Sequence, residues 1–269
     1  MIRILQFPIS TLKWQQCLIV HDLHYKFDYL FKVICIGFFF NNFLPSTIGG
    51  DGYRIVKTIP QDGHRSRALS AVLLDRLVGS AVLLGLGLLC SLAKYHDSSV
   101  MIFRTFNLVG VSAFALSLIF FLTARVRRSR LASLKNWVIN HPKLQPLVVN
   151  AAYITAHRKR LINVLWISLG FHMVAILSIN LLFHSLDLET SLFDCAIVVA
   201  LTGFVSLIPI SLNGIGLMEG SFVFLCAQIG LPVQESAIAI FIYRIMTLLY
   251  SAACGLIYFF AQVENGNRV

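Results

Sequence analysis

Charged residues are scarce in this sequence, and acidic residues are the scarcest of them. The 269 residues include 12 Asp and Glu against 22 Lys and Arg, and charged residues make up 13% of the chain while hydrophobic residues make up 57%. Soluble globular domains carry about 25% charged residues. A chain with this composition would expose too much apolar surface in water, which excludes a soluble protein.

Several motifs that identify sites are also missing. There is no GxxxxGK[ST] motif for a bound nucleotide, so any transport would be passive or driven by an ion or proton gradient. The six cysteines form no CxxC pair and mostly lie in apolar runs, so we expect neither disulfides nor a metal, and no cofactor. Despite the net charge of +10, no interleaved aromatic motif accompanies the basic residues, and we expect no nucleic-acid partner.

Long apolar runs are what the sequence has in place of these motifs. A helix needs roughly 20 apolar residues to cross a bilayer, and four runs reach that length: Ala68 to Leu92, Val100 to Ala124, Leu161 to Phe183 and Ser236 to Gln262. We therefore predict an all-α, polytopic transmembrane helical bundle that forms a single transmembrane domain over residues 1–269.

The basic residues are concentrated in one segment, which sets the expected orientation. Nine of the 22 Lys and Arg lie between Arg125 and Arg160, a stretch without Asp or Glu. The positive-inside rule makes Arg125 to Arg160 cytoplasmic, where each basic residue would contribute about 1 kcal/mol of attraction to anionic headgroups. This segment is either an interfacial amphipathic helix or a polar loop. The acidic loop from His184 to Asp194 is expected outside.

Two apolar segments are too short to cross as straight helices. Tyr29 to Leu44 ends in Asn41, Asn42 and Pro45, and Leu217 to Ile229 follows Pro209 and a Gly-rich turn. We predict broken or re-entrant helices here. If the second is re-entrant the C-terminus is external, and if it spans the C-terminus is cytoplasmic. The Gly-rich, charged linker from Ser46 to Arg67 is predicted to be a loop at the membrane surface.

The order of features around these two segments is the same, which suggests an internal repeat with halves at 29–124 and 161–262. Each half has a proline, then glycines with an acidic residue, then a glycine, then a helix that carries an arginine. Matching interrupted segments in two halves of a chain are typical of a transporter binding site. The alternative is that the Gly and Pro residues only make tight turns.

Four ionisable residues fall near the middle of apolar segments: Asp75, Arg76, Glu219 and Arg244. Such residues cost about 2.5 to 3.5 kcal/mol each on insertion scales, so they need partners or water. We predict the cross-pairs Asp75 with Arg244 and Glu219 with Arg76. The alternative is a salt-bridge lock that holds no ligand.

A break in a helix frees backbone N–H groups that attract a phosphate or carboxylate, and glycine lets a headgroup approach the backbone closely. We therefore predict a substrate-binding site formed by Asn42, Pro45, Gly49, Gly50, Asp51, Arg54, Asp75, Arg76, Pro209, Asn213, Gly214, Gly216, Glu219, Tyr243 and Arg244.

An ordered set of these motifs runs from Asn42-Phe-Leu-Pro45 through Gly49-Gly50-Asp51-x-x-Arg54 and Asp75-Arg76 to Pro209, Gly214-x-Gly216-x-x-Glu219 and Tyr243-Arg244. The set resembles the lysylphosphatidylglycerol synthase transmembrane region, a flippase-like family of membrane proteins. The resemblance, over about Trp14 to Phe260, implies a bacterial or archaeal cell (inner) membrane and movement of lipid between leaflets.

Two departures from the family limit what the resemblance implies. Members usually begin with further spanning helices, so we expect the N-terminus to be truncated. No aminoacyl-transferase domain follows Val269, so lysine transfer is not expected.

We predict a multi-pass protein that binds and translocates an anionic or amphipathic lipid. One alternative is a membrane-embedded transferase with Asp51 or Glu219 as general base, although no nucleophile–base pair supports catalytic residues. Another is an accessory subunit that delivers lipid to a separate enzyme partner.

Overall fold

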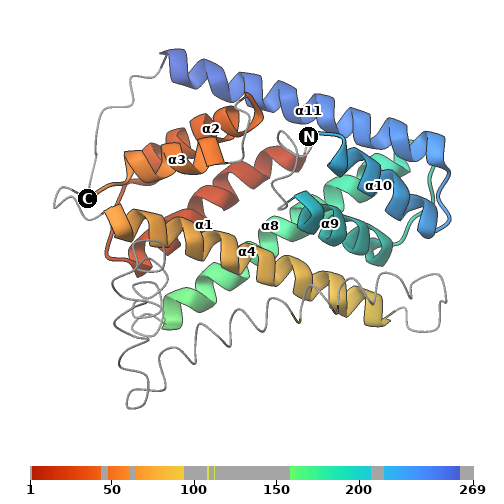
Figure 1. Cartoon of the computed structure of the whole chain (residues 1–269), viewed down its shortest axis with the longest axis horizontal. Coiled ribbons are helices and arrows are strands. Elements are labelled where there is room, and N and C mark those ends of the chain that lie inside the picture. Colours follow the sequence, from red (N-terminus) through yellow and green to blue (C-terminus); the bar gives the residue numbers. More distant parts are fainter. Residues whose placement is uncertain are drawn as a thin grey trace, which may run out of the picture.

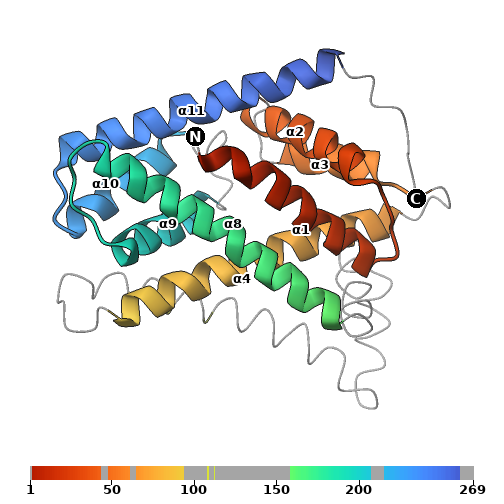
Figure 2. The ribbon, with the colours of Figure 1, turned by 180° about the vertical axis from the view of Figure 1, so that it is seen from behind.

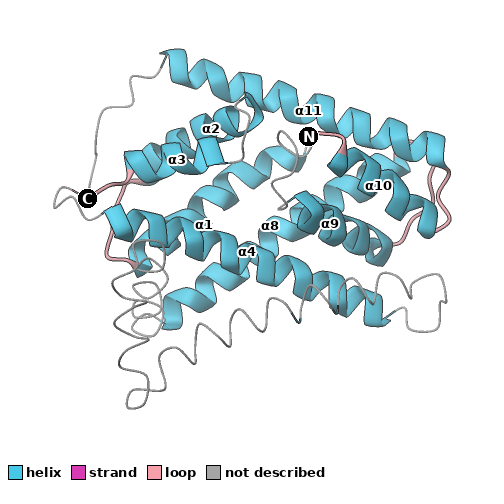
Figure 3. Ribbon diagram, in the orientation of Figure 1, coloured by secondary structure: helices cyan, strands magenta, loops and turns pink. Residues whose placement is uncertain are grey.

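The computed structural model describes residues 2–43, 48–60, 65–93, 108, 112, 158–206 and 215–260. In these ranges the elements are helices, as Figures 1 and 3 show, and the predicted all-α bundle is confirmed. They are η1 (Ile2–Leu5), α1 (Gln6–Val20), α2 (Phe27–Phe43), α3 (Ile48–Lys57), α4 (Arg65–Ala93), α8 (Arg158–His184), α9 (Leu192–Ser206), α10 (Leu217–Gln228) and α11 (Val233–Phe260). Apart from Leu108 and Ser112, the predicted span Val100 to Ala124 lies outside the described residues, as does nearly all of the basic segment Arg125 to Arg160.

Within the described ranges, three helices are long and apolar enough to cross a membrane: α4, α8 and α11. They coincide with three of the four predicted spans. The helices α4 and α11 begin three residues before the predicted starts, at Arg65 and Val233. The reason is that hydropathy marks the part of a helix that would lie in hydrocarbon, whereas the helix itself continues through the polar residues at its entrance.

The helices α3 and α10 are the shortest of the described α-helices and are too short to cross. With 10 residues in α3 and 12 in α10, their lengths are about 15 and 18 Å at 1.5 Å per residue, against roughly 30 Å of hydrocarbon. The prediction of a surface loop from Ser46 to Arg67 is wrong, because the helix α3 lies within this segment. Its side chains Tyr53 and Ile55 pack on the buried core, and Arg54 is only 8% exposed.

The glycines of this segment serve close packing between α2 and α3. A Cβ atom on Gly50 would lie 2.1 Å from the carbonyl oxygen of Gly37 and 2.6 Å from the Asn41 side chain. The backbone N–H of Gly50 donates to Oδ1 of Asn41 at 2.8 Å. Glycine content that suggested a loop therefore allows two helix backbones to touch.

The described helices follow the same order twice. The series α2, α3, α4 has 17, 10 and 29 residues, and the series α9, α10, α11 has 15, 12 and 28. Packing crosses between the series, because α4 packs on α9, α11 packs on α2, and α1 packs on α8. Figures 1 and 2 show α4 and α11 along opposite edges of the molecule, running in opposite directions.

The buried hydrophobic side chains form two clusters. One joins α1, α2 and α4 around Trp14 and Leu30, and the other joins α8, α9, α10 and α11 around Phe183 and Phe222. The charged residues described next lie at the inner edges of these two clusters.

Candidate functional site

The first charged cluster consists of Lys13 on α1, Asp51 and Arg54 on α3, and Asp75 and Arg76 on α4. Asp75 is its centre, because one carboxylate oxygen forms an ion pair with Nζ of Lys13 and the other accepts a hydrogen bond from Nη2 of Arg54, both at 2.9 Å. Three helices are thereby joined by one carboxylate.

Asp51 extends this network to the neighbouring arginine. Its Oδ2 accepts from Nε of Arg76 at 2.9 Å and from Nη2 at 2.8 Å, and its Oδ1 lies 3.3 Å from Nη1 of Arg54. The two carboxylates therefore hold all three basic side chains, and formal charges leave an excess of +1.

Burial makes the first charged cluster costly to disturb. Asp75, Lys13 and Arg54 are 5%, 7% and 8% exposed. The guanidinium of Arg54 also lies over the ring of Trp14, 4.4 Å from its centroid. Ions removed from water are tolerated only when they are well paired, and removing one partner leaves an uncompensated charge. Arg76 differs, with 41% of its side chain exposed.

The second charged cluster is a single pair, Glu219 on α10 and Arg244 on α11. Nε of Arg244 donates to Oε1 of Glu219 at 2.6 Å, and the backbone N–H of Gly216 donates to Oε2 at 2.7 Å. Gly216 has φ +82°, in the region that favours glycine, and Glu219 thus closes the start of α10. Nη2 of Arg244 is buried and has no hydrogen-bond partner among the described residues.

The predicted cross-pairs are wrong. Each arginine binds the acidic residue of its own half, and both pairs are 25 residues apart in sequence: Asp51 with Arg76, and Glu219 with Arg244. The cross-pairing was drawn from the mid-helix positions of Asp75 and Glu219. It failed because Lys13, on a helix that the sequence did not mark as a span, binds Asp75 together with Arg54.

The equal separation extends to neighbouring residues. When the sequences of the two halves are aligned so that Asp51 corresponds to Glu219, Gly52 corresponds to Gly220 and Gly87 corresponds to Gly255. In the same alignment, the first residue of α4, Arg65, corresponds to the first residue of α11, Val233.

The remaining predicted site residues divide into three groups. The Asn42 amide donates to the Phe38 carbonyl at 2.9 Å within α2, and Gly49 lies in the first turn of α3. Tyr243 lies away from the acid–arginine pairs, against Arg3, whose guanidinium carbon is 3.9 Å from its ring centroid. Outside the described residues are Pro45, Pro209, Asn213 and Gly214.

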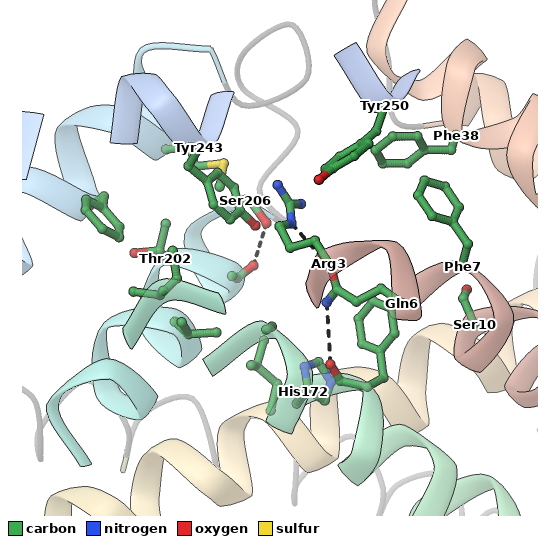
Figure 4. Close-up of a pocket in the computed structure, with 18 of the residues that line it drawn as sticks. Arg3, Gln6, Phe7, Ser10, Phe38, His172, Thr202, Ser206, Tyr243 and Tyr250 are labelled. Atoms are coloured by element: carbon green, nitrogen blue, oxygen red, sulfur yellow. Dashed lines mark hydrogen bonds between the residues drawn. The ribbon is translucent and has the colours of Figure 1, made fainter. Parts of the chain in front are cut away.

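Tyr243 also lines a cavity of about 310 Å³ between the two series of helices. Figure 4 shows Arg3 inside this cavity between Tyr243 and Tyr250. No pattern in the sequence marks Arg3 or Lys13 as site residues, because both precede Tyr29 to Leu44, the first apolar segment. The mixture of Gln6, Ser10 and Lys13 with apolar residues in one 15-residue helix was the available signal of a partly polar interior.

Among the described residues, no group of three or more His, Cys, Asp or Glu side chains is placed to hold a metal ion. The chemistry that the two clusters offer is therefore that of guanidinium and ammonium groups, which bind phosphate and carboxylate oxygens.

Comparison with known proteins gives one finding. The family model for the lysylphosphatidylglycerol synthase TM region matches residues 1–255. No curated protein and no solved structure matches the chain significantly.

Proposed function

The chain belongs to the family of the lysylphosphatidylglycerol synthase transmembrane region, and we propose that it binds an anionic or amphipathic lipid and moves it between the leaflets of a membrane. Family membership and three long apolar helices make it a membrane protein of a lipid-related family. The translocation step, the lipid and the residues that bind it are our proposal.

One observation carries the proposal: two acid–arginine pairs with the same 25-residue separation lie between a short helix and a long one. Neither α3 nor α10 can cross hydrocarbon, so each places polar groups part of the way through the membrane. Groups there are expensive unless they have a use, and pathways for polar substrates are their common use.

The pairs suggest how a headgroup would be passed along. A carboxylate and a phosphate both present oxygens that a guanidinium binds with two parallel N–H groups. A lipid phosphate can therefore replace Asp51 at Arg76, or Glu219 at Arg244, without leaving an arginine unpaired. The partly exposed Arg76 would receive the headgroup more readily than Arg244, whose side chain is 16% exposed.

We further propose that residues 29–124 and 161–262 are inverted repeats. The opposed directions of α4 and α11 (Figure 1) support this arrangement, as does the equal register of their arginines. Because Arg76 and Arg244 lie at the same distance from the starts of opposed helices, the two pairs would face opposite leaflets. One pair would accept the headgroup and the other would release it.

The location follows from the same proposal. We place the protein in the cell (inner) membrane with the Arg125–Arg160 segment on the cytoplasmic side, because that segment holds nine of the 22 Lys and Arg residues. Membrane lipids are its expected partners. A separate enzyme that makes or uses the lipid is a further expected partner.

Lipid transfer in vesicles tests the proposal. Purified protein is reconstituted with a fluorescent phosphatidylglycerol, and the fraction of probe reached by an external quencher is followed over time. We expect Arg76→Gln and Arg244→Gln each to reduce transfer to the rate of protein-free vesicles, because either pair is needed for passage. Arg65→Gln, which removes an exposed arginine outside the basic segment, should transfer at the wild-type rate.

Three results would contradict the proposal. Wild-type protein that transfers no probe rules out translocation, and transfer that survives in both variants rules out the pairs as the pathway. Chemical conversion of the lipid, detected by mass spectrometry, would favour the transferase alternative instead.

A further inference from the structure

The cavity between the two series of helices is lined by polar side chains that the charged clusters do not use. Its volume is about 310 Å³, and its polar lining includes Arg3, Gln6, Ser10, Thr202 and Ser206. Figure 4 places these side chains around one space, with Phe7 beside Ser10 and Phe38 next to Phe7. Part polar and part apolar, the cavity has the character of a site for an amphipathic molecule.

Arg3 brings a positive charge into this space. Its Nη1 donates to the hydroxyl of Thr247 at 2.7 Å, and its Nε lies 3.4 Å from Oε1 of Gln6. The Tyr243 ring covers one face of the guanidinium. These partners are neutral, and no carboxylate within the described part of the chain pairs with Arg3, in contrast to Arg54, Arg76 and Arg244. A bound anion would supply the missing negative charge.

Thr202 provides a second, independent observation. It is 3% exposed, it lines the same cavity, and its hydroxyl has no hydrogen-bond partner among the described residues. A buried hydroxyl without a partner costs free energy, so such groups are uncommon unless something else binds them. A ligand in the cavity would satisfy it.

An adjoining cavity of about 300 Å³ shares Arg3, Tyr243 and Tyr250 with the first, and the rest of its lining is mainly apolar. Leu181, Ile242 and Met246 line it and are 50%, 36% and 36% exposed. They lie on α8 and α11, two of the helices that can cross a membrane. This second cavity therefore leads from the outer surface of the bundle to Arg3, and its lining suits a hydrocarbon chain.

We propose that the two cavities together bind one phosphodiester lipid with a single net negative charge. The phosphate would bind Arg3, a hydroxyl of a small headgroup such as glycerol would bind Thr202, and an acyl chain would occupy the cavity between α8 and α11. One uncompensated guanidinium matches one phosphodiester charge. The inference rests on the proposed function, in that it names the lipid class and where it is held between the two charged pairs.

Binding to the purified full chain in neutral detergent tests this assignment. A fluorescent dioleoyl phosphatidylglycerol is bound and then displaced by unlabelled dioleoyl phosphatidylglycerol, dioleoyl phosphatidylcholine, glycerophosphoglycerol or inorganic phosphate. We expect phosphatidylglycerol to displace the probe best, because the other lipid has no net charge and the soluble phosphates have no chain for the apolar cavity. Equal displacement by inorganic phosphate would overturn the lipid as occupant.

Variants then locate the site. Arg3→Gln removes the charge and should weaken phosphatidylglycerol binding at least about tenfold, whereas Arg3→Lys should lose less. Thr202→Val keeps the shape and removes one hydroxyl, so binding should weaken roughly two- to tenfold while the melting temperature does not fall. Arg65→Gln, at an exposed arginine outside the basic segment, should bind like wild type. Unchanged binding by Arg3→Gln overturns the proposal.

Measuring transfer on the same variants separates this inference from the proposed function. If wild-type protein moves lipid but Arg3→Gln binds it normally, the cavity assignment fails and translocation stands. If Arg3-dependent binding is found but no wild-type transfer, the cavity assignment stands and translocation fails.

Discussion

The two charged clusters occupy corresponding positions but are built differently. The first buries Asp75 against Lys13 and Arg54 and connects through Asp51 to Arg76, so that five side chains hold one another. Among the described residues, the second contains only Glu219 and Arg244. In the sequence alignment that matches Asp51 with Glu219, Arg54 corresponds to Phe222 and Asp75 corresponds to Tyr243. Aromatic residues in the second series thus take the places of ions in the first.

This difference suggests a division of roles between the two series. The part of the first cluster around Asp75 joins α1, α3 and α4 and is deeply buried, which suits a fixed anchor. In the second series, the residue that corresponds to Asp75 is Tyr243. Its side chain lines the cavity and packs over the guanidinium of Arg3. Asp75 thus holds helices of the first series together through ion pairs, whereas Tyr243, at the corresponding position of the second series, forms part of the cavity wall between the two series.

Removing the central carboxylate should break the first cluster with the largest effect. Asp75→Asn leaves Lys13 and Arg54 buried without that negative charge, and we expect the free energy of unfolding to fall by about 3 to 5 kcal/mol. Unfolding in a denaturing detergent measures the change. Asp28→Asn, at an exposed position in the first turn of α2, should cost no more than about 1 kcal/mol. Equal losses would show that Asp75 is no anchor.

Separating α2 from α3 should disturb the same series nearly as much. A methyl group in Gly50→Ala meets the Gly37 carbonyl at 2.1 Å, so one helix must shift, at a cost of about 3 kcal/mol, the upper end of the usual range for overpacking. Gly52→Ala meets no atom within 4 Å and should be neutral or stabilising. Matching stabilities for the two variants, measured by thermal unfolding, would contradict the close packing of α3.

Opening the second cluster should have the smallest effect on stability. Glu219→Gln leaves Arg244 with a neutral partner in a site where both side chains are 16 to 17% exposed, and we expect a loss of about 1 to 2 kcal/mol. The double variant Glu219→Gln/Arg244→Gln should lose less than the two single variants together. A loss as large as that of Asp75→Asn would remove the distinction between anchor and adaptable pair.

Hydropathy and length predicted the three long apolar helices and the short helix α10, because crossing hydrocarbon imposes a minimum run of apolar residues. The same reasoning marked Asp75, Arg76, Glu219 and Arg244 as groups that need partners, since an ion in an apolar segment is conspicuous.

Which groups pair could not be predicted, because pairing depends on how helices cross rather than on where charges lie in sequence. Lys13 lies in a helix of mixed polarity, so its contact with Asp75 had no periodic signal. The equal separation of 25 residues between each acid and its arginine was present in the sequence. It is visible only when the two halves are aligned on the starts of α4 and α11, whose positions the sequence did not define. The composition of residues 46–67 likewise concealed α3, because glycine favours both turns and close helix contacts.

The crossed packing constrains how the bundle can rearrange. The long helix of each series packs on the first helix of the opposite series: α4 packs on α9, and α11 packs on α2. Tilting α4 therefore carries α9 with it, and tilting α11 carries α2. Any movement of one series relative to the other must therefore shift both of these helix contacts together.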